Sequence, residues 1–94
     1  MTKFIRFTSK NDLRDNLWNL EVGSVVCYGR KSNNSGRDWY ESASISSNEA
    51  ASSFISNGHK FGFASESYGN HISVPKGFGK VIEINSRGFR IEIF

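Results

Sequence analysis

The C-terminal stretch 81–94 is the part of this sequence that most narrows what the chain can fold into. Apolar residues alternate on both sides of a polar turn at 85–88: Ile82 and Ile84 before it, and Phe89, Ile91 and Ile93 after it. Closing the turn predicts three cross-strand pairs: Ile84 with Phe89, Ile82 with Ile91, and Glu83 with Arg90. Each pair joins two apolar side chains or two opposite charges, which is favourable across a ladder. The pattern therefore predicts an antiparallel hairpin.

The aliphatic and aromatic residues favour strands over helices in the rest of the chain. Eight Phe, eight Ile and five Val stand against three Leu, and β-branched and aromatic residues suit a pleated surface. All three Leu lie in one segment, at Leu13, Leu17 and Leu20, and their spacing predicts one helix with a buried stripe. That helix begins at Ser9 or Asn11, and Gly23 stands where a terminating glycine is expected.

Alternation and capping residues place the remaining elements. Strands are expected at 3–8, 24–30 and 38–45, the last two joined as a hairpin by the polar loop 31–37. Ser46 and Glu49 form a capping box, so a second helix should follow and end at Gly58. Its inward residues would be Ala51, Phe54 and Ile55. Further strands are expected at 60–65 and 71–74, the second ended or held at a sheet edge by Pro75.

This order predicts one α+β domain over residues 1–94, with a mainly antiparallel sheet and two helices. The first two-thirds of the chain would follow the β-α-β-β-α-β, ferredoxin-like order, with an appended C-terminal β-hairpin. Two segments, 11–14 and 48–61, resemble the helices of an RNA-recognition-motif domain. That resemblance implies base stacking on sheet aromatics, for which Phe4 and Trp39 are the matching positions, with Arg37 beside them.

A third segment, Lys76-Gly77-Phe78-Gly79-Lys80-Val81, resembles the signature octet of the same family. One interpretation is a bend made by two glycines before the final hairpin. The other is a flexible basic and aromatic contact loop, in which Phe78 stacks on bases while Lys76 and Lys80 hold phosphates. We keep both interpretations open at this point.

Arg30, Lys31 and Arg37 frame the polar loop of the first hairpin, and Trp39 and Tyr40 follow at once. This is the densest group of basic and aromatic residues in the chain. Arginine and large aromatics anchor protein interfaces and stack on bases. The sequence therefore makes this hairpin end the first candidate binding surface, against the alternative of a solvated tip with Trp39 in the core.

Catalysis is not expected from this sequence. Cys27, His59 and His71 are the residues that suggest a nucleophile or a zinc site, and they are scattered without metal-ligand spacing. The carboxylates show no acid–base pairing, and no phosphate-binding or dinucleotide motif is present. We expect no enzyme activity, no metal and no cofactor.

The net charge of +3 allows anionic partners without requiring them. The absence of a membrane-length apolar run and of a signal peptide favours the cytoplasm. In size, polar surface and build, the chain resembles the small phage-borne anti-CRISPR inhibitors, which implies steric blocking of a bacterial nucleoprotein complex. The expected partner is then a host protein or protein–RNA complex. An RNA or single-stranded DNA-binding module and a phage structural or assembly subunit are the alternatives, and the oligomeric state stays open.

Overall fold

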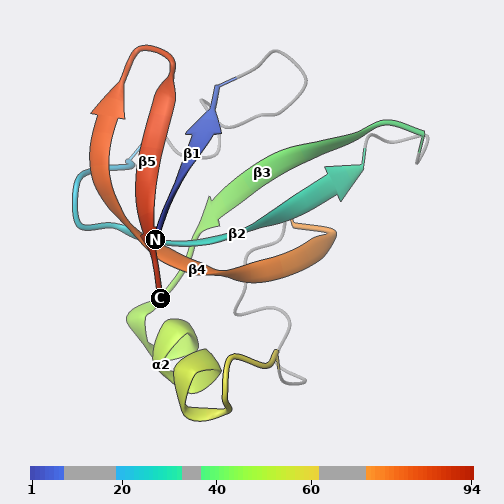
Figure 1. The fold of residues 1–94 in the computed structure, drawn as a ribbon, viewed down its shortest axis with the longest axis vertical. Helices are drawn as coiled ribbons and strands as arrows, with labels where there is room; N and C mark the ends of the chain where they lie inside the picture. Colours follow the sequence, from blue (N-terminus) through green and yellow to red (C-terminus); the bar gives the residue numbers. More distant parts are fainter. Residues whose placement is uncertain (8–18, 33–36, 62–71) are drawn as a thin grey trace.

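The computed structural model describes residues 1–7, 19–32, 37–61 and 72–94 of this chain. These residues form an α+β arrangement of a five-stranded antiparallel sheet and the helix α2 (Figure 1). The strands are β1 (Thr2–Arg6), β2 (Val25–Ser32), β3 (Trp39–Ile45), β4 (Val74–Asn85) and β5 (Gly88–Ile93). The helix α2 covers Asn48–Ser56. In space the strands follow the order β1-β5-β4-β2-β3.

The two predicted hairpins are confirmed. Strand β2 pairs with β3 through seven residue pairs, from Val26 with Ile45 to Ser32 with Trp39. Strand β4 pairs with β5, with Ile84 opposite Phe89 and Glu83 opposite Arg90. Residues opposite each other in a ladder share a face, so each of these pairs lies on one side of the sheet. Burial does not alternate strictly along β3 and β4, since three successive residues are buried in each strand.

The ferredoxin-like order with two helices is wrong for the described part of the chain. The C-terminal hairpin is not an appendage: β4 and β5 lie in the middle of the sheet, between β1 and β2. Strand β1 pairs with β5, joining the two ends of the chain. Since β4 and β5 each have a neighbour on both sides, they bury more apolar surface there than an outlying hairpin would.

Strand β4 is long and bent, and it belongs to both halves of the sheet. Its first half crosses the molecule beside β2 and its second half rises beside β5 (Figure 1). The bend fits Gly79, where an added Cβ would lie 2.8 Å from the Ile91 Cδ1 atom and 3.1 Å from the Glu92 carbonyl oxygen. Only a glycine lets the backbones approach so closely without a shift.

A register shift between Val81 and Glu83 accompanies this bend. It puts Val81 opposite Ile91, so the predicted pair of Ile82 with Ile91 is wrong. An extra residue in one strand turns the following side chains to the other face. Val81 is therefore 1% exposed, whereas Ile82 is 41% exposed.

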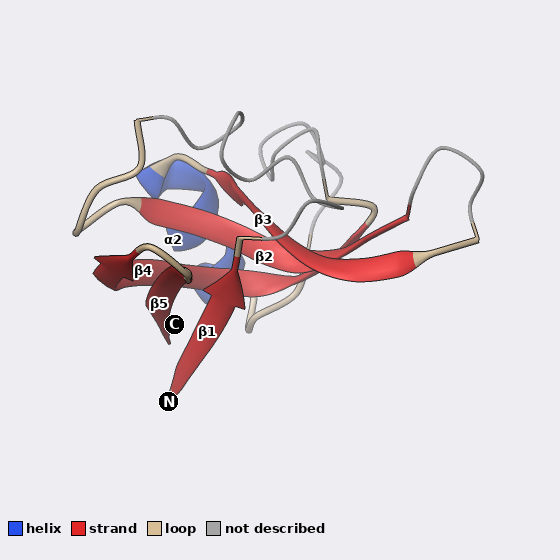
Figure 2. Cartoon of the chain, turned by 90° about the horizontal axis from the view of Figure 1, so that it is seen from above, coloured by secondary structure: helices blue, strands red, loops and turns tan. Residues whose placement is uncertain are grey.

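Apolar residues are buried on both faces of the sheet, in two clusters. The first draws on all five strands and contains Ile5, Val26, Ala43, Val81, Phe89 and Ile91. The second lies between the sheet and α2 and contains Val25, Cys27, Ala50, Ala51, Phe54 and Phe78. Figure 2 shows α2 on one side of the curved sheet. Strand β2 contributes to both clusters, which explains its nearly continuous apolar start.

Helix α2 begins one residue later than predicted. Ser47, not Ser46, is the N-cap, and its hydroxyl oxygen accepts a hydrogen bond from the Ala50 N–H at 3.1 Å. Ala50 is buried together with the predicted Ala51 and Phe54, whereas Ile55 is exposed.

The other expected elements are met only in part. The segment 71–74 was expected to end at Pro75, but β4 starts at Val74 and continues far past that proline. Residues 76–81 therefore form part of a strand and not a contact loop, whereas the predicted bend is found within this strand at Gly79. The first predicted helix falls mostly on residues 8–18, and most of the strand expected at 60–65 falls on 62–65; these residues lie outside the described part. No helix among the described residues is long and apolar enough to cross a membrane.

Candidate functional site

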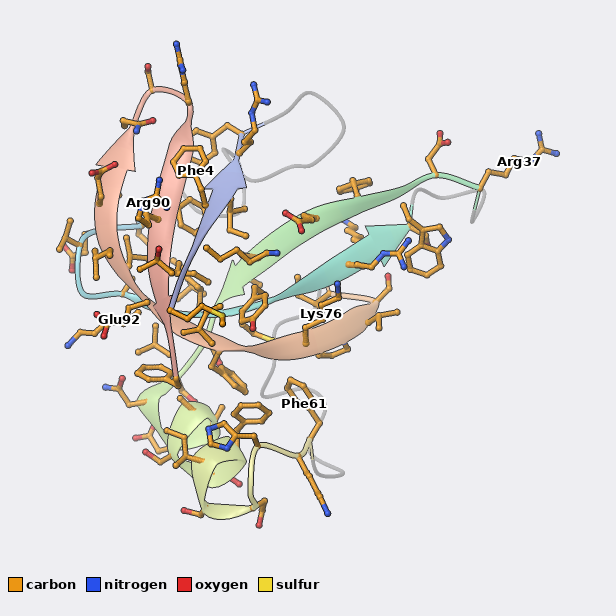
Figure 3. All side chains as sticks on the ribbon, viewed as in Figure 1. Phe4, Arg37, Phe61, Lys76, Arg90 and Glu92 are labelled. Carbon is orange, nitrogen blue, oxygen red and sulfur yellow. The ribbon has the colours of Figure 1, made fainter. Side chains whose placement is uncertain are left out.

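The hairpin-end surface consists of Arg30, Lys31, Arg37, Trp39 and Tyr40, at the end of the hairpin where β2 ends and β3 begins. This end of the hairpin extends away from the rest of the sheet, with Arg37 at its far limit (Figure 3). Arg30, Arg37 and Trp39 are exposed, and Lys31 and Tyr40 are half-buried. The structure thus brings together the residues that the sequence nominated, and it keeps Trp39 out of the core.

Arg30 and Trp39 form the best-defined contact on this surface. The Arg30 guanidinium carbon lies 5.1 Å from the centre of the Trp39 ring. A cation over an aromatic face at an exposed site contributes about 0.5–1 kcal/mol. Trp39 stays 45% exposed, so much of this large side chain is available to a partner.

The hairpin-end surface has two faces, which the sequence alone did not separate. Arg30 pairs with Glu41, and Trp39 with Ser32, so these side chains lie on one face of the ribbon. Lys31 pairs with Tyr40, which places those two on the other face. A flat partner would therefore meet either the Arg30–Trp39 face or the Lys31–Tyr40 face.

Among the described residues, positive charges outnumber negative ones at this end of the hairpin. Among the carboxylates near the hairpin, Glu41 forms an ion pair with Lys3 of β1, with Nζ and Oε1 2.8 Å apart. Its charge is thus partly balanced from outside the hairpin. Asp38 is the acidic residue next to Arg37 in the chain, and Arg30, Lys31 and Arg37 are the basic residues of this surface. An anionic partner surface complements this balance.

Val74 adds an apolar residue that the sequence did not connect with the hairpin. It lies opposite Arg30 in the β2–β4 ladder and is 45% exposed. The neighbouring Ser73 N–H donates a hydrogen bond to the Arg30 carbonyl oxygen at 3.0 Å. Only the pairing of β4 with β2 brings Val74 here, because it is far from Arg30 along the chain.

The three site residues predicted from the 76–81 segment do not form a contact loop. Phe78 is 0% exposed, and its ring packs at 5.2 Å from Phe54 and 5.7 Å from Phe61. Its prediction as a stacking residue is corrected, because a ring enclosed in the core offers no face to a base. Lys76 and Lys80 are exposed, but Lys80 lies opposite Glu92 in the middle of the sheet. Lys76 lies between Pro75, which is opposite Gly29, and Gly77, which is opposite Tyr28, at the middle of β2 (Figure 3).

The residues considered for chemistry occupy separate places. Cys27 is 0% exposed in the second cluster, and burial raises the pKa of its thiol to about 12. His59 is exposed just after α2, and its ring stands at 85° to the Phe54 ring, with the two ring centres 5.2 Å apart. His71 lies outside the described part. Within the ranges that the structure describes, no three His, Cys, Asp or Glu side chains are grouped to hold a metal ion.

Phe4, the predicted first-strand stacking position, lies on a different surface from Trp39. It stands opposite Arg90 of β5, with the Arg90 guanidinium carbon 5.3 Å from the ring centre. The sequence did not suggest this contact, since the two residues come from opposite ends of the chain.

Comparison of the chain with protein-family models, with curated proteins and with solved structures finds no match.

Proposed function

We propose that this protein works by binding and not by catalysis, occupying a surface of a partner through the hairpin-end surface. The observation that carries the proposal is Trp39, 45% exposed and held under Arg30 on a hairpin that extends from the sheet. Trp and Arg are the residues most enriched among those that dominate binding energy in protein interfaces. Val74 beside Arg30 extends the apolar part of the contact.

The structural context of Cys27 supports binding over chemistry. A thiol whose pKa is raised to about 12 stays protonated near neutral pH, so it is a poor nucleophile. The proposed mode of action is steric. The specific form that we propose is a phage-borne inhibitor, similar in general character to anti-CRISPR proteins, that covers a working surface of a bacterial nucleoprotein complex. The positive charge of the hairpin end complements the anionic surface of such a complex.

The test is binding of the purified chain to a panel of purified CRISPR effector complexes, measured by biolayer interferometry, with target-DNA binding by each complex as second readout. We expect at least one complex to be bound and blocked. The double variant Arg30→Ala/Trp39→Ala should then weaken binding at least about 30-fold, which corresponds to about 2 kcal/mol for residues of this kind.

The matched control is Lys60→Ala/Ile55→Ala. It also removes one positive charge and one 45% exposed apolar side chain, but from α2 and the segment that follows it. Its affinity should stay within about threefold of the unmodified chain. Equal losses in the two double variants would refute the hairpin end as the binding surface, and failure to bind any complex in the panel would refute the inhibitor proposal.

A further inference from the structure

A second basic and aromatic surface lies on the outer side of β1 and β5. It consists of Phe4, Arg6, Arg87 and Arg90, and we call it the arginine surface. Phe4 and Arg6 are two residues apart on β1, so they share a face, and Phe4 lies opposite Arg90. The Arg87 carbonyl oxygen accepts a hydrogen bond from the Phe7 N–H at 2.8 Å, which holds the β4–β5 turn beside the end of β1.

The face that Phe4, Arg6 and Arg90 occupy is opposite the first buried cluster, and Arg87 lies in the turn at the end of this face. Ile5 and Phe89, which alternate with Phe4 and Arg90 along the strands, are 1% and 0% exposed. Phe4 and Arg90 are half-buried, and Arg6 and Arg87 are exposed. Figure 3 shows the labelled Phe4 and Arg90 side chains next to each other over the two strands.

The contact between Arg90 and Phe4 places a guanidinium group and an aromatic ring together on the surface, as a platform for a ligand. A guanidinium that rests on an aromatic ring loses little further freedom when a ligand arrives, and it keeps five N–H donors in a rigid fork. Those donors match the geometry of a phosphate. A ring and a guanidinium plane are also the two side-chain surfaces on which unpaired bases stack.

Among the described residues, positive charges outnumber negative ones on this surface near the β4–β5 turn. Glu83 lies opposite Arg90 and balances one arginine, while Glu92 lies opposite Lys80 farther along the strands. Arg6 and Arg87 lie at the turn end. The turn itself is fixed by Asn85, whose side-chain oxygen accepts hydrogen bonds from the N–H groups of Arg87 at 2.8 Å and Gly88 at 3.2 Å.

We propose that the arginine surface binds single-stranded nucleic acid, with the arginines on successive phosphates and a base against the Phe4–Arg90 pair. Phosphate contacts need several cations on one face, and base contacts need a flat aromatic or guanidinium surface; the arginine surface has both. An acidic protein would use the charges but has no need of the platform. The site is separate from the hairpin-end surface, so it does not depend on the function proposed above.

The test uses the free chain of 94 residues and a fluorescein-labelled oligouridylate of twelve nucleotides, which has little structure of its own. Fluorescence anisotropy at two or more salt concentrations gives the affinity and its salt dependence. The variant Arg87→Ala/Arg90→Ala should weaken binding at least about tenfold, and the slope of log affinity against log salt should fall by about 1.4, since each phosphate contact contributes about 0.7.

Lys60→Ala/Lys76→Ala is the matched control, because it also lowers the net charge by two but changes exposed residues that belong neither to the arginine surface nor to the hairpin-end surface. It should change the affinity by less than about threefold. Equal losses in the two variants would show attraction by overall charge alone and would overturn the proposal. A dissociation constant weaker than about 10⁻⁴ M for the unmodified chain would also overturn it, and an acidic protein face would then be the anionic partner to test.

Two more variants guard against loss of folding. Arg90→Lys keeps the charge opposite Glu83 and should fold, yet it should weaken binding about threefold or more, because an ammonium lacks the planar fork. Phe4→Leu keeps an apolar side chain and removes the ring, so a loss of several-fold is expected from lost stacking. Unchanged affinity in both variants, with circular dichroism like that of the unmodified chain, would contradict the platform.

Discussion

Cys27 and Phe78 are opposite each other on β2 and β4, and burial decides what each of them can do. Both side chains are 0% exposed in the cluster beneath α2. Phe78 was expected from its glycine-rich surroundings to contact a ligand, and Cys27 was considered as a nucleophile. Removal of a thiolate from water is costly, so the buried thiol stays neutral. The aromatic ring contributes to the core in the same cluster.

We predict that Cys27 is unreactive in the folded protein and makes stability fall in alkaline solution. Burial raises the pKa of the thiol from 9.0 to about 12, so above about pH 9 the unfolded chain releases a proton that the folded chain keeps. The stabilising effect is complete below pH 9 and is lost as pH rises toward 12. The unfolding free energy of the unmodified chain should therefore drop relative to Cys27→Ala by up to about 1.4 kcal/mol per pH unit in that window.

Thiol labelling with Ellman's reagent at pH 8 gives a second measurement. The folded chain should react far more slowly than the chain in 6 M guanidinium chloride, since the reagent needs an exposed thiolate. Equal rates in the two conditions, or parallel alkaline profiles for the unmodified chain and Cys27→Ala, would contradict the buried thiol.

In strand β4 the sequence pattern predicted a strand correctly but predicted one of its cross-strand pairs wrongly. The sequence pattern favours Ile82 as a core residue, because Ile82, Ile84, Phe89 and Ile91 make one consistent set. The shift between Val81 and Glu83 places Val81 inside instead. A strand that serves two neighbours, first β2 and then β5, has to turn, and the extra residue accommodates the turn.

The shift predicts an unusual order of stability for two alanine variants. Val81→Ala removes the smaller side chain but should destabilise the fold by about 2 kcal/mol, because Val81 is 1% exposed. Ile82→Ala removes the larger side chain and should cost less than about 1 kcal/mol, since Ile82 is 41% exposed. Urea unfolding of the two variants measures the difference. A larger loss of unfolding free energy for Ile82→Ala would contradict the register shift and support the pairing of Ile82 with Ile91.

For the whole molecule, the curvature of the sheet brings its two edge strands together. Lys3 of β1 and Glu41 of β3 form an ion pair at 2.8 Å, and the Lys3 ammonium is 5.9 Å from the centre of the Tyr28 ring. The first cluster lies on this same side of the sheet, with residues from all five strands. The apolar contacts are therefore expected to supply most of the stabilisation, with the ion pair as a small addition.

A double-mutant cycle on Lys3→Ala and Glu41→Ala should give a small coupling. The side chains are 29% and 52% exposed, and pairs of this kind contribute about 0.2–1 kcal/mol. Raising the salt concentration to 1 M should remove most of it by screening. A coupling well above 1 kcal/mol that persists at high salt would show that the pair, and not the apolar cluster, holds the edges together.

Local pattern by itself determined β1, β2, β3, β5 and the second half of β4, together with the two hairpins, the helix after residue 46 and the grouping of the hairpin-end residues, because alternation and capping act over a few neighbouring residues. Tertiary structure alone decided the strand order, the inward turn of Val81, the burial of Phe78 and the meeting of Phe4 with Arg90. Those features depend on contacts between residues distant in the chain, where burial of apolar surface outweighs local preference. The arginine surface could not be predicted from the sequence for the same reason, because it forms only when β1 pairs with β5 and brings the two ends of the chain together.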